Sequence, residues 1–484
     1  MNGQLENSSF DFYLKTIPEI GYVTGLFHSI IVVDGLPGAH VNEIVIFKNG
    51  GIGQVFSLFP GKVEILILKS TQIAVGDMLV RTGKSLKINL SNDVLGKTIG
   101  PLGEDIEDAI VKSNKDSNIT FEIDKKPLGI LGRKPVDKFF ETGVSLVDLI
   151  VPLGKGQREL IIGDRKTGKT EFLLQAATAH AKSGGIVVYS IIGQRQADIL
   201  KRAQFFKDSG ILAQSVVVAS NAEDPPGLIF LTPYTACTVS EYFANSGFDV
   251  LLILDDMTSH ARYYREISLL SRRFPGKDSY PGDIFYVQAK IIERAGNFDK
   301  GSITCLPVAE SVAGDLSGYI QTNLMAMTDG HLYFDADLYN QGKRPSVNPL
   351  LSVTRVGHQT QSPLMRDISR VLSNFIVSYE KMKQYKHFGA EAGEIVKDVL
   401  DIGNKLDNFL NQSDYKLVPI NINILVVGAI WANLVDNVDF ETIFDKYQNN
   451  LEYKKSVDKL ISDSSTFDIL IRSIKENTNI ITKN

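Results

Sequence analysis

The most informative stretch of this 484-residue sequence is Gly163-Asp164-Arg165-Lys166-Thr167-Gly168-Lys169-Thr170. It fits the pattern G-x-x-x-x-G-K-[ST], in which glycines let backbone N–H groups approach phosphate oxygens. The apolar residues 159–162 predict a strand before it, and residues 169–182 predict a helix that ends near Gly184-Gly185. A helix N-terminus adds partial positive charge at this point. The sequence therefore predicts a phosphate-binding loop between a strand and a helix.

Three residues are candidates to hold a nucleoside triphosphate with its metal ion. Lys169 would reach the β- and γ-phosphates, and the Thr170 hydroxyl would bind Mg²⁺. Asp255 follows the apolar run 250–254, where a carboxylate at the end of a parallel strand holds Mg²⁺ directly or through water. A solvated strand end is the alternative interpretation of Asp255. The expected cofactor is ATP or ADP with Mg²⁺, and the predicted nucleotide-binding residues run from Gly163 to Glu171.

The pattern of residues changes twice along the chain. The first ninety residues hold short runs rich in Val, Ile and Phe, separated by Gly and Pro, which predicts a small closed β-barrel. From Gln157 onward, strands alternate with helices, and this rhythm predicts an α/β domain with a mainly parallel sheet. From Leu364 onward, apolar residues recur every three to four positions, which predicts a helical domain. The expected fold class is thus a multidomain α/β protein.

Composition excludes several classes of protein. Hydrophobic content is 43% and charged content 22%, as in ordinary globular proteins, and the net charge of -5 argues against a nucleic-acid binder that relies on bulk positive charge. The two cysteines, Cys237 and Cys305, form neither a disulfide framework nor a metal spacing, which favours a reducing cytoplasm. The first twenty residues are polar and no window reaches the roughly 18 apolar residues of a membrane span.

Further motifs resemble one family in colinear order. They are residues 153–165, Ile192-Gly193-Gln194, Glu241-Tyr242-Phe243, Tyr280-Pro281-Gly282-Asp283, Ala313-Gly314-Asp315 and Ser352-Val353-Thr354-Arg355-Val356-Gly357. With these motifs the chain resembles the α subunit of F1-type rotary ATPases and ATP synthases from about residue 19 to 450. The N-terminus is shorter than in typical α subunits and has poor helical periodicity. Together with the Asn-, Lys- and Ile-rich composition, this suggests a divergent paralogue of the mollicute type.

The resemblance implies a three-domain chain in an alternating hexamer. The expected parts are a tail at 1–18, a β-barrel domain at 19–88, a RecA-like nucleotide-binding domain at 89–366 and a helical domain at 367–484. The implied partners are a catalytic β-like subunit and a central stalk γ-like subunit, while a peripheral stalk or other adaptor stays open. No nucleic-acid partner is expected. The implied location is the cytoplasm or the inner face of the cell membrane, with membrane contact only through other subunits.

The resemblance also assigns roles to Gln194 and Arg355. Catalytic chains of the family have a Glu where this chain has Gln194, and a neutral amide cannot hold negative charge beside the attacking water. We therefore expect this chain to bind nucleotide without useful turnover, although a Gln does orient water in Ras-type GTPases. Arg355 matches the arginine finger that α subunits place in the neighbouring catalytic site; a surface salt bridge is its alternative interpretation.

Two segments match those that line the adenine base in α subunits. Arg344, Pro345 and Gln412 fit the family pattern, whereas Asp414 stands where a second Gln is more common. An ionised Asp accepts hydrogen bonds but donates none, so Asp414 bears on base selectivity. Lys166 also stands in place of a Gln and would either strengthen phosphate binding or point to solvent.

Three alternatives to a synthase subunit stay open from the sequence. The chain could belong to an F1-like machine with another task, such as surface motility, by analogy with wall-less bacteria. It could be a self-contained hexameric translocase, which Gln194 and the lack of an RNA-binding basic cluster disfavour. It could also be a structural adaptor that retains its nucleotide permanently.

Overall fold

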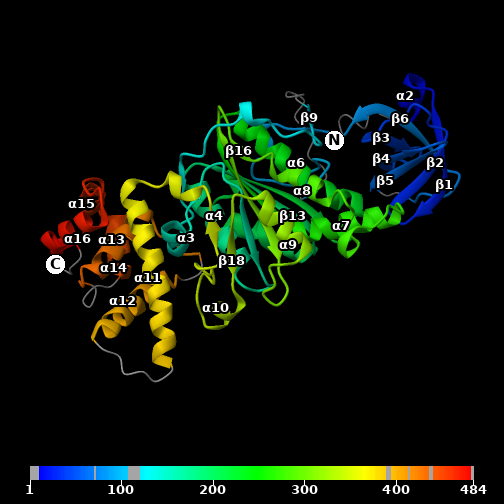
Figure 1. The fold of residues 1–484 in the computed structure, drawn as a ribbon. Coiled ribbons are helices and arrows are strands. Elements are labelled where there is room, and N and C mark those ends of the chain that lie inside the picture. The colour runs from blue at the N-terminus through cyan, green and yellow to red at the C-terminus, as the bar shows by residue number, and fades with distance from the viewer. Residues whose placement is uncertain are drawn as a thin grey trace. The chain divides into compact units, whose positions relative to one another are not determined.

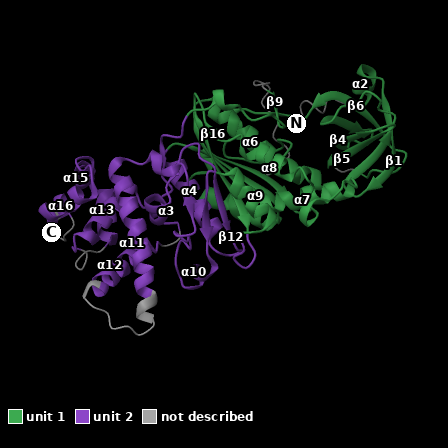
Figure 2. Ribbon diagram, in the orientation of Figure 1, with its two compact units in different colours: residues 1–134, 184–310, 316–328 green, residues 135–183, 311–315, 329–484 purple. Residues whose placement is uncertain are grey.

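The computed structural model describes residues 10–69, 72–106, 120–387, 394–412, 415–434 and 440–480. The chain divides into two compact units, shown in green and purple in Figure 2. Unit 1 comprises residues 1–134, 184–310 and 316–328, and unit 2 comprises residues 135–183, 311–315 and 329–484. Because the chain passes between the units several times, the phosphate-binding loop belongs to unit 2, whereas Gln194 and Asp255 belong to unit 1.

A six-stranded barrel in unit 1 closes in the order β1-β2-β5-β4-β3-β6, as the sequence predicts (blue in Figure 1). Alternate side chains such as Val23, Ile31, Val45 and Ile65 fill its interior, which is the pattern of a sheet with one buried face. Its strands are β1 Ile20–Phe27, β2 Ile30–Asp34, β3 Glu43–Phe47, β4 Ile52–Phe59, β5 Lys62–Lys69 and β6 Met78–Ser85.

A short helix, α2 (Phe10–Thr16), precedes the barrel where the sequence shows poor helical periodicity. Its apolar side chains Phe10, Tyr13 and Leu14 pack on Ile46 and Val80 of the barrel. Two turns are too few to give a periodic signal, and so short a helix is stable only through such tertiary contact.

Unit 1 also holds a set of parallel strands in the order β17-β15-β13-β14-β8, with β16 antiparallel to β17. The interiors of β13, β14, β15 and β17 are buried, which explains their continuous apolar runs. These strands are β8 Thr98–Ile99, β13 Ile186–Gln194, β14 Ser215–Asn221, β15 Asp249–Asp255, β16 Gly296–Asn297 and β17 Ser302–Glu310. The helices are α5 Gln196–Asp208, α6 Pro226–Asn245, α7 Met257–Leu270, α8 Ile284–Ile292 and α9 Tyr319–Met327.

Short elements complete unit 1. They are the strand pair β7 Lys87–Asn89 and β9 Thr120–Glu122, and the 3-10 turns η1 Asn92–Val94, η2 Ile130–Gly132, η3 Leu212–Gln214 and η4 Lys277–Ser279.

In unit 2, the strand before the loop pairs in parallel with β18, and β19 pairs antiparallel with β18. Helix α4 follows the loop, as predicted. The strands are β10 Phe139–Phe140, β11 Leu153–Gly154, β12 Glu159–Gly163, β18 Gly330–Phe334 and β19 Val353–Thr354. The helices among them are α3 Ser145–Ile150, α4 Lys169–Lys182, α10 Ala336–Asn340 and the 3-10 turn η5 Gly357–Thr360.

The C-terminal part of unit 2 is helical, which confirms the predicted fold class (yellow to red in Figure 1). Helix α13 is apolar on all sides because it contacts α12, α14, α15 and α16. The helices are α11 Pro363–His387, α12 Glu394–Leu410, α13 Ile420–Trp431, α14 Phe440–Asn449, α15 Leu451–Ser462, α16 Phe467–Glu476 and the turn η7 Thr478–Ile480. Among the described helices, none is both long and apolar enough to cross a bilayer.

Candidate functional site

The predicted loop connects the end of β12 to the start of α4, and two glycines set its backbone. A side chain at Gly163 would meet the carbonyl oxygen of Phe334 at 2.3 Å, so only glycine fits there. Gly168 has φ of 85° and stands at the N-cap of α4, where no side chain caps the helix. The first-turn N–H groups of a helix lack intrahelical partners and attract anions. This backbone therefore suits a phosphate group.

Side chains hold the loop in shape. The Lys169 ammonium donates to the carbonyl oxygen of Gly163 at 2.7 Å, and the Thr167 hydroxyl donates to the carbonyl oxygen of Asp164 at 2.8 Å. The Asp164 carboxylate accepts from the Ser311 hydroxyl at 2.5 Å and from the Gly314 N–H. These bonds fix the loop before any ligand contact and hold the Lys169 charge at its mouth.

The remaining loop residues differ in exposure. Arg165 and Lys166 are exposed, and Lys166 has φ of 61°, the left-handed region that side chains seldom adopt. Thr170 and Glu171 are half-buried in the first turn of α4. Tyr339 of α10 lies against the loop, since its ring would be 3.6 Å from a side chain at Gly168.

The residues present fit a Mg–nucleotide. The loop offers an uncapped helix N-terminus, the Lys169 ammonium and the Thr170 hydroxyl, which are the groups that bind phosphate oxygens and Mg²⁺ in such loops. When bound, Mg²⁺ neutralises charge on the phosphates. Thr170 would be its ligand in unit 2, and Asp255 is the candidate in unit 1.

Asp255 lies at the end of β15 in unit 1 and is 7% exposed. The buried Tyr189 hydroxyl donates to its Oδ2 at 2.8 Å, and Nη2 of Arg202 lies 3.8 Å from the same oxygen. The Arg202 side chain is largely buried. The buried arginine partly compensates the burial of the Asp255 carboxylate.

The neighbouring Asp256 has a different role. Its carboxylate accepts from the Ser259 N–H at 2.5 Å and caps helix α7. Burial, and secondarily the charge of Asp255, raise the pKa of Asp256 to about 7. The Asp256 carboxyl is therefore partly protonated at neutral pH.

Gln194 ends β13 in the same unit, close to Asp255. Its Nε2 donates to the backbone carbonyl of Asp255 at 3.2 Å, and the side chain is half-buried. Sequence-distant residues 194 and 255 therefore meet at the carboxyl end of neighbouring parallel strands, where α/β proteins place their ligands.

Arg355 follows β19 and its side chain is exposed. Its backbone N–H donates to the carbonyl of Asp329 at 3.0 Å. The Asp329 carboxylate accepts two bonds from the Arg158 guanidinium, at 2.6 and 3.0 Å. Among the described residues, no carboxylate lies within ion-pair distance of the Arg355 guanidinium, and its charge acts from further away on the buried Glu159. The backbone at Arg355 is thus fixed while its charge faces outward.

The two predicted base-contacting segments meet in unit 2. The Gln412 N–H donates to the Arg344 carbonyl and the Arg344 N–H donates to Asn411 Oδ1, both at 2.7 Å. The Arg344 guanidinium stacks 3.6 Å from the Tyr339 ring. The buried Gln412 amide accepts from the Ser145 N–H and donates to the Gly143 carbonyl, so its contact with a base stays a prediction. Asp414 lies outside the described residues.

Two family models match this chain. The nucleotide-binding domain of the ATP synthase alpha/beta family matches residues 143–354, and the C-terminal domain of the same family matches residues 361–477. The ATP synthase subunit alpha of Staphylococcus aureus strains JH9, Mu3 and NCTC 8325 is 32% identical over 491 aligned residues, covering 98% of this chain and 97% of each relative.

The chain belongs to the ATP synthase alpha/beta family.

Within this family the chain is alpha-like and carries the nucleotide-binding domain. The first match includes the loop, Gln194, Asp255 and Arg344, and it ends directly before Arg355. Gln412 lies in the second match. The resemblance stated from short motifs is therefore confirmed along nearly the whole chain.

Sequence reasoning missed several residues that shape the site. Tyr339 beside the loop, Arg202 beside Asp255, and Asp329 beneath Arg355 belong to no short motif. Their partners are distant in sequence, and no pattern within one segment indicates such pairs. Helix α5 mixes charged and apolar residues, so its sequence does not single out Arg202.

Proposed function

We propose that this chain is the non-catalytic, nucleotide-binding alpha-like subunit of an F1-type ATPase complex. It holds Mg–ATP or Mg–ADP at residues 163–171, with Thr170 and Asp255 as the metal-binding residues. It donates Arg355 to the catalytic site of an adjacent β-like subunit. The supporting observation is Arg355 itself, an exposed guanidinium on a backbone fixed by Asp329.

The geometry of Arg355 suits action on a neighbouring chain. A guanidinium is permanently charged and planar, so it can stabilise the charge on a transferring phosphoryl group. Such a residue must be held in place at its base yet be exposed at its tip. The Arg158–Asp329 pair holds the backbone of Arg355 in place, and the Arg355 guanidinium is exposed. Thr354 adds support, because its hydroxyl donates to the Pro152 carbonyl at 3.0 Å.

Gln194 is the reason to call this chain non-catalytic. General-base assistance to the attacking water needs a group that can accept a proton, such as a carboxylate, and the Gln194 amide is neutral and does not accept one at any accessible pH. Its Nε2 already donates to the Asp255 carbonyl. We therefore propose that nucleotide is retained at this chain's loop and that turnover occurs on the partner.

The same proposal names partners and the base contacts. A β-like subunit would alternate with this chain around a γ-like central stalk, in the cytoplasm or at the inner face of the membrane. Arg344, Pro345 and Gln412 would lie along the base, with the loop holding the phosphates. The domain limits 19–88, 89–366 and 367–484 are part of this proposal.

The test compares Arg355→Ala with Arg370→Ala in the complex with the β-like partner. Arg370 is a matched control, an exposed arginine of the same unit that pairs with Asp367 of its own helix. Removing a phosphoryl-stabilising arginine costs about 10³–10⁵ in rate. We expect Arg355→Ala to lose ATPase activity on this scale while ATP binding to this chain is kept, and Arg370→Ala to keep both. Normal hydrolysis by Arg355→Ala would refute the arginine-finger role.

A further inference from the structure

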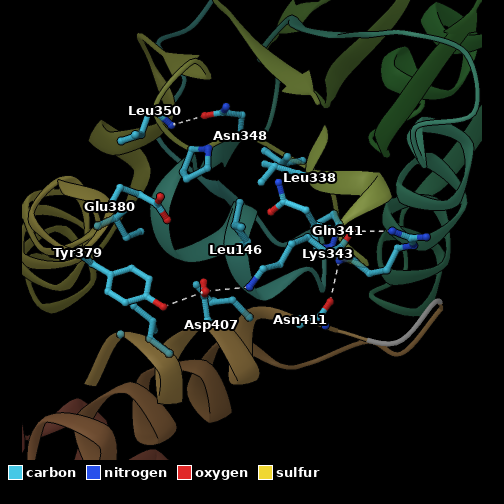
Figure 3. Close-up of a pocket in the computed structure, with 18 of the residues that line it drawn as sticks. Leu146, Leu338, Gln341, Lys343, Asn348, Leu350, Tyr379, Glu380, Asp407 and Asn411 are labelled. Atoms are coloured by element: carbon cyan, nitrogen blue, oxygen red, sulfur yellow. Dashed lines mark hydrogen bonds and ion pairs between the residues drawn. The ribbon is translucent and has the colours of Figure 1, made fainter. Parts of the chain in front are cut away.

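Charged side chains in a pocket of unit 2 pair with one another (Figure 3). The pocket has a volume of about 300 Å³ and lies among α3, α11, α12 and the segment 338–350. The Lys343 ammonium is 2.8 Å from the Asp407 carboxylate, and the Lys383 ammonium is 3.4 Å from the Glu380 carboxylate. These charges of opposite sign balance each other within the pocket.

A buried carboxyl elsewhere in unit 2, that of Glu159, is not balanced in this way. Glu159 begins β12, and both it and Gln157 are 0% exposed. The Gln157 Nε2 donates to Oε2 of Glu159 at 2.7 Å, whereas Oε1 has no hydrogen-bond partner among the described residues. A buried polar atom without a partner costs free energy, so packing alone does not explain a carboxyl at this position.

The neighbouring strands leave space for this carboxyl. Glu159 pairs with Gly330 of β18, and Gly330 pairs in turn with Thr354 of β19. A Cβ at Gly330 would lie 2.6 Å from Oε2 of Glu159 and 2.1 Å from the Val353 carbonyl oxygen. The missing side chain at Gly330 therefore leaves room for the Glu159 carboxyl close to β19, whose last residue directly precedes Arg355.

The Gln157 amide connects this carboxyl to the base of Arg355. Its Nε2 also donates to the Thr354 hydroxyl oxygen at 3.1 Å, and its Oε1 accepts from the Gly154 N–H at 2.8 Å. Acceptors at Nε2 and a donor at Oε1 fix the orientation of the amide. The Thr354 hydroxyl oxygen accepts from the Gly357 N–H as well, at 3.0 Å. Residues on both sides of Arg355 are therefore tied to Gln157.

The protonation of Glu159 also bears on Arg355. Burial raises the pKa of the Glu159 carboxyl well above its ordinary value; the Gln157 hydrogen bond and the Arg355 charge lower it in part, and the Asp329 charge raises it further. An ionised carboxylate here would attract the guanidinium inward, whereas a neutral carboxyl accepts from Gln157 without this attraction. Burial thus favours the exposed position of the guanidinium.

We propose that Gln157 and Glu159 are positioning residues for Arg355. The Glu159 carboxyl orients the Gln157 amide, and this amide holds Thr354 so that the guanidinium is presented to the neighbouring subunit. The inference rests on the proposed arginine-finger role, and both residues act through Thr354 without touching the phosphates. A misplacement of about 1 Å can cost about 10²-fold in rate, so breaking this chain of hydrogen bonds should be measurable.

The test uses the complex with the β-like partner and breaks the chain of hydrogen bonds at two points. Thr354→Val keeps the shape of the side chain and removes its hydroxyl, and Glu159→Leu removes the acceptor for Gln157. We expect each to lower kcat for ATP hydrolysis at least tenfold with KM unchanged, since the positioned group acts in the transition state. Glu159→Gln keeps an acceptor and should lose less than Glu159→Leu.

The matched control is Thr178→Val, the same change at a buried threonine of α4. The Thr178 hydroxyl donates to the Leu174 carbonyl of its own helix at 2.8 Å, so this variant should keep kcat. Thr354→Val should also leave ATP binding to this chain unchanged in equilibrium dialysis.

A double-mutant cycle separates positioning from a general loss of structure. In the Arg355→Ala background, single-turnover hydrolysis should show no further loss from Thr354→Val or Glu159→Leu, because the group that they position is absent. A structural defect would lower the rate in both backgrounds.

Equal losses in the two backgrounds, equal losses for Glu159→Gln and Glu159→Leu, or an unchanged kcat in Thr354→Val would overturn the proposal. Failure of this inference is distinguishable from failure of the proposed function. Normal hydrolysis by Arg355→Ala refutes the arginine finger itself, whereas a loss in Arg355→Ala with none in Thr354→Val refutes the positioning role alone.

Discussion

Single side chains carry the chemistry assigned to this chain. The Lys169 ammonium is held between loop carbonyls, so its charge is already in place when a phosphate arrives. The neighbouring Lys166 has a left-handed backbone, and its side chain is exposed to solvent. Two lysines three residues apart should thus contribute very differently to nucleotide binding.

The first prediction compares these two lysines. Lys169→Ala removes a positive charge at the phosphates and should weaken Mg–ATP binding by at least about a hundredfold, since hydrogen bonds to charged groups contribute about 1.5–3 kcal/mol each. Lys166→Ala should change the affinity by less than about fivefold, as expected of an exposed charge. Equilibrium dialysis of the purified chain measures both. Comparable losses in the two variants would show that Lys166 also contacts the phosphates.

Only some of the individual site residues could be predicted from the sequence. Residues 163–171 follow from a local pattern, since a loop, its strand and its helix are contiguous in sequence. The pairing of Arg202 with Asp255, and of Asp329 with the backbone of Arg355, depends on the tertiary fold.

Most helices and strands of this chain could be predicted from the sequence. The buried parallel strands of unit 1 are continuous apolar runs, and α13 is apolar on all sides for the same reason. Helix α2 could not be predicted from the sequence, because Tyr13 packing on the barrel stabilises it more than its own helical periodicity does. Packing between helices also places polar groups where sequence alone gives no warning, as at His260.

The second prediction concerns the packing of α6 against α7. His260 is fully buried and stacks on Phe230 at 5.0 Å, and burial lowers the pKa of His260 to about 4. Between that value and the unfolded value of about 6.5, the unfolded chain binds the proton and the folded chain does not, so stability falls as pH decreases. The loss between about pH 7 and pH 5 should be about 2 kcal/mol from this residue.

The substitution His260→Leu should remove the part of the acid-induced loss of stability that is due to this histidine. Urea unfolding of the wild type and the variant at the two pH values gives the comparison, and any change of stability common to both values cancels. If the wild type and the variant lose the same free energy of unfolding on acidification, His260 is not the group responsible.

The third prediction concerns the contact of α11 with α12. A Cβ at Gly403 would lie 2.1 Å from Cδ2 of the buried Tyr379 ring. Gly403→Ala should therefore destabilise the helical part of unit 2 by about 1–3 kcal/mol through overpacking, despite the gain of about 1 kcal/mol in helix propensity. The control is Asn408→Ala, an exposed position of the same helix. Chemical denaturation followed by Trp431 fluorescence should show the loss only for Gly403→Ala.

The fold class was predicted correctly because the chain shows three distinct patterns: short punctuated strands, alternating strands and helices, and then helices alone. The predicted barrel, the mainly parallel strands and the helical C-terminus are all present. The division into two compact units was not predicted, since it follows from the chain returning to unit 2 at residues 311–315 and 329. Such returns leave no mark in local sequence patterns.

The central claim is that this chain retains its nucleotide while a β-like partner performs the hydrolysis. The most direct measurement is ATPase activity of two crossed complexes: one with Lys169→Ala in this chain and wild-type partner, the other with wild-type chain and the equivalent lysine replaced in the partner. We predict that the first complex keeps most of its steady-state activity and that the second loses it. Loss of activity in the first complex with activity retained in the second would contradict the account.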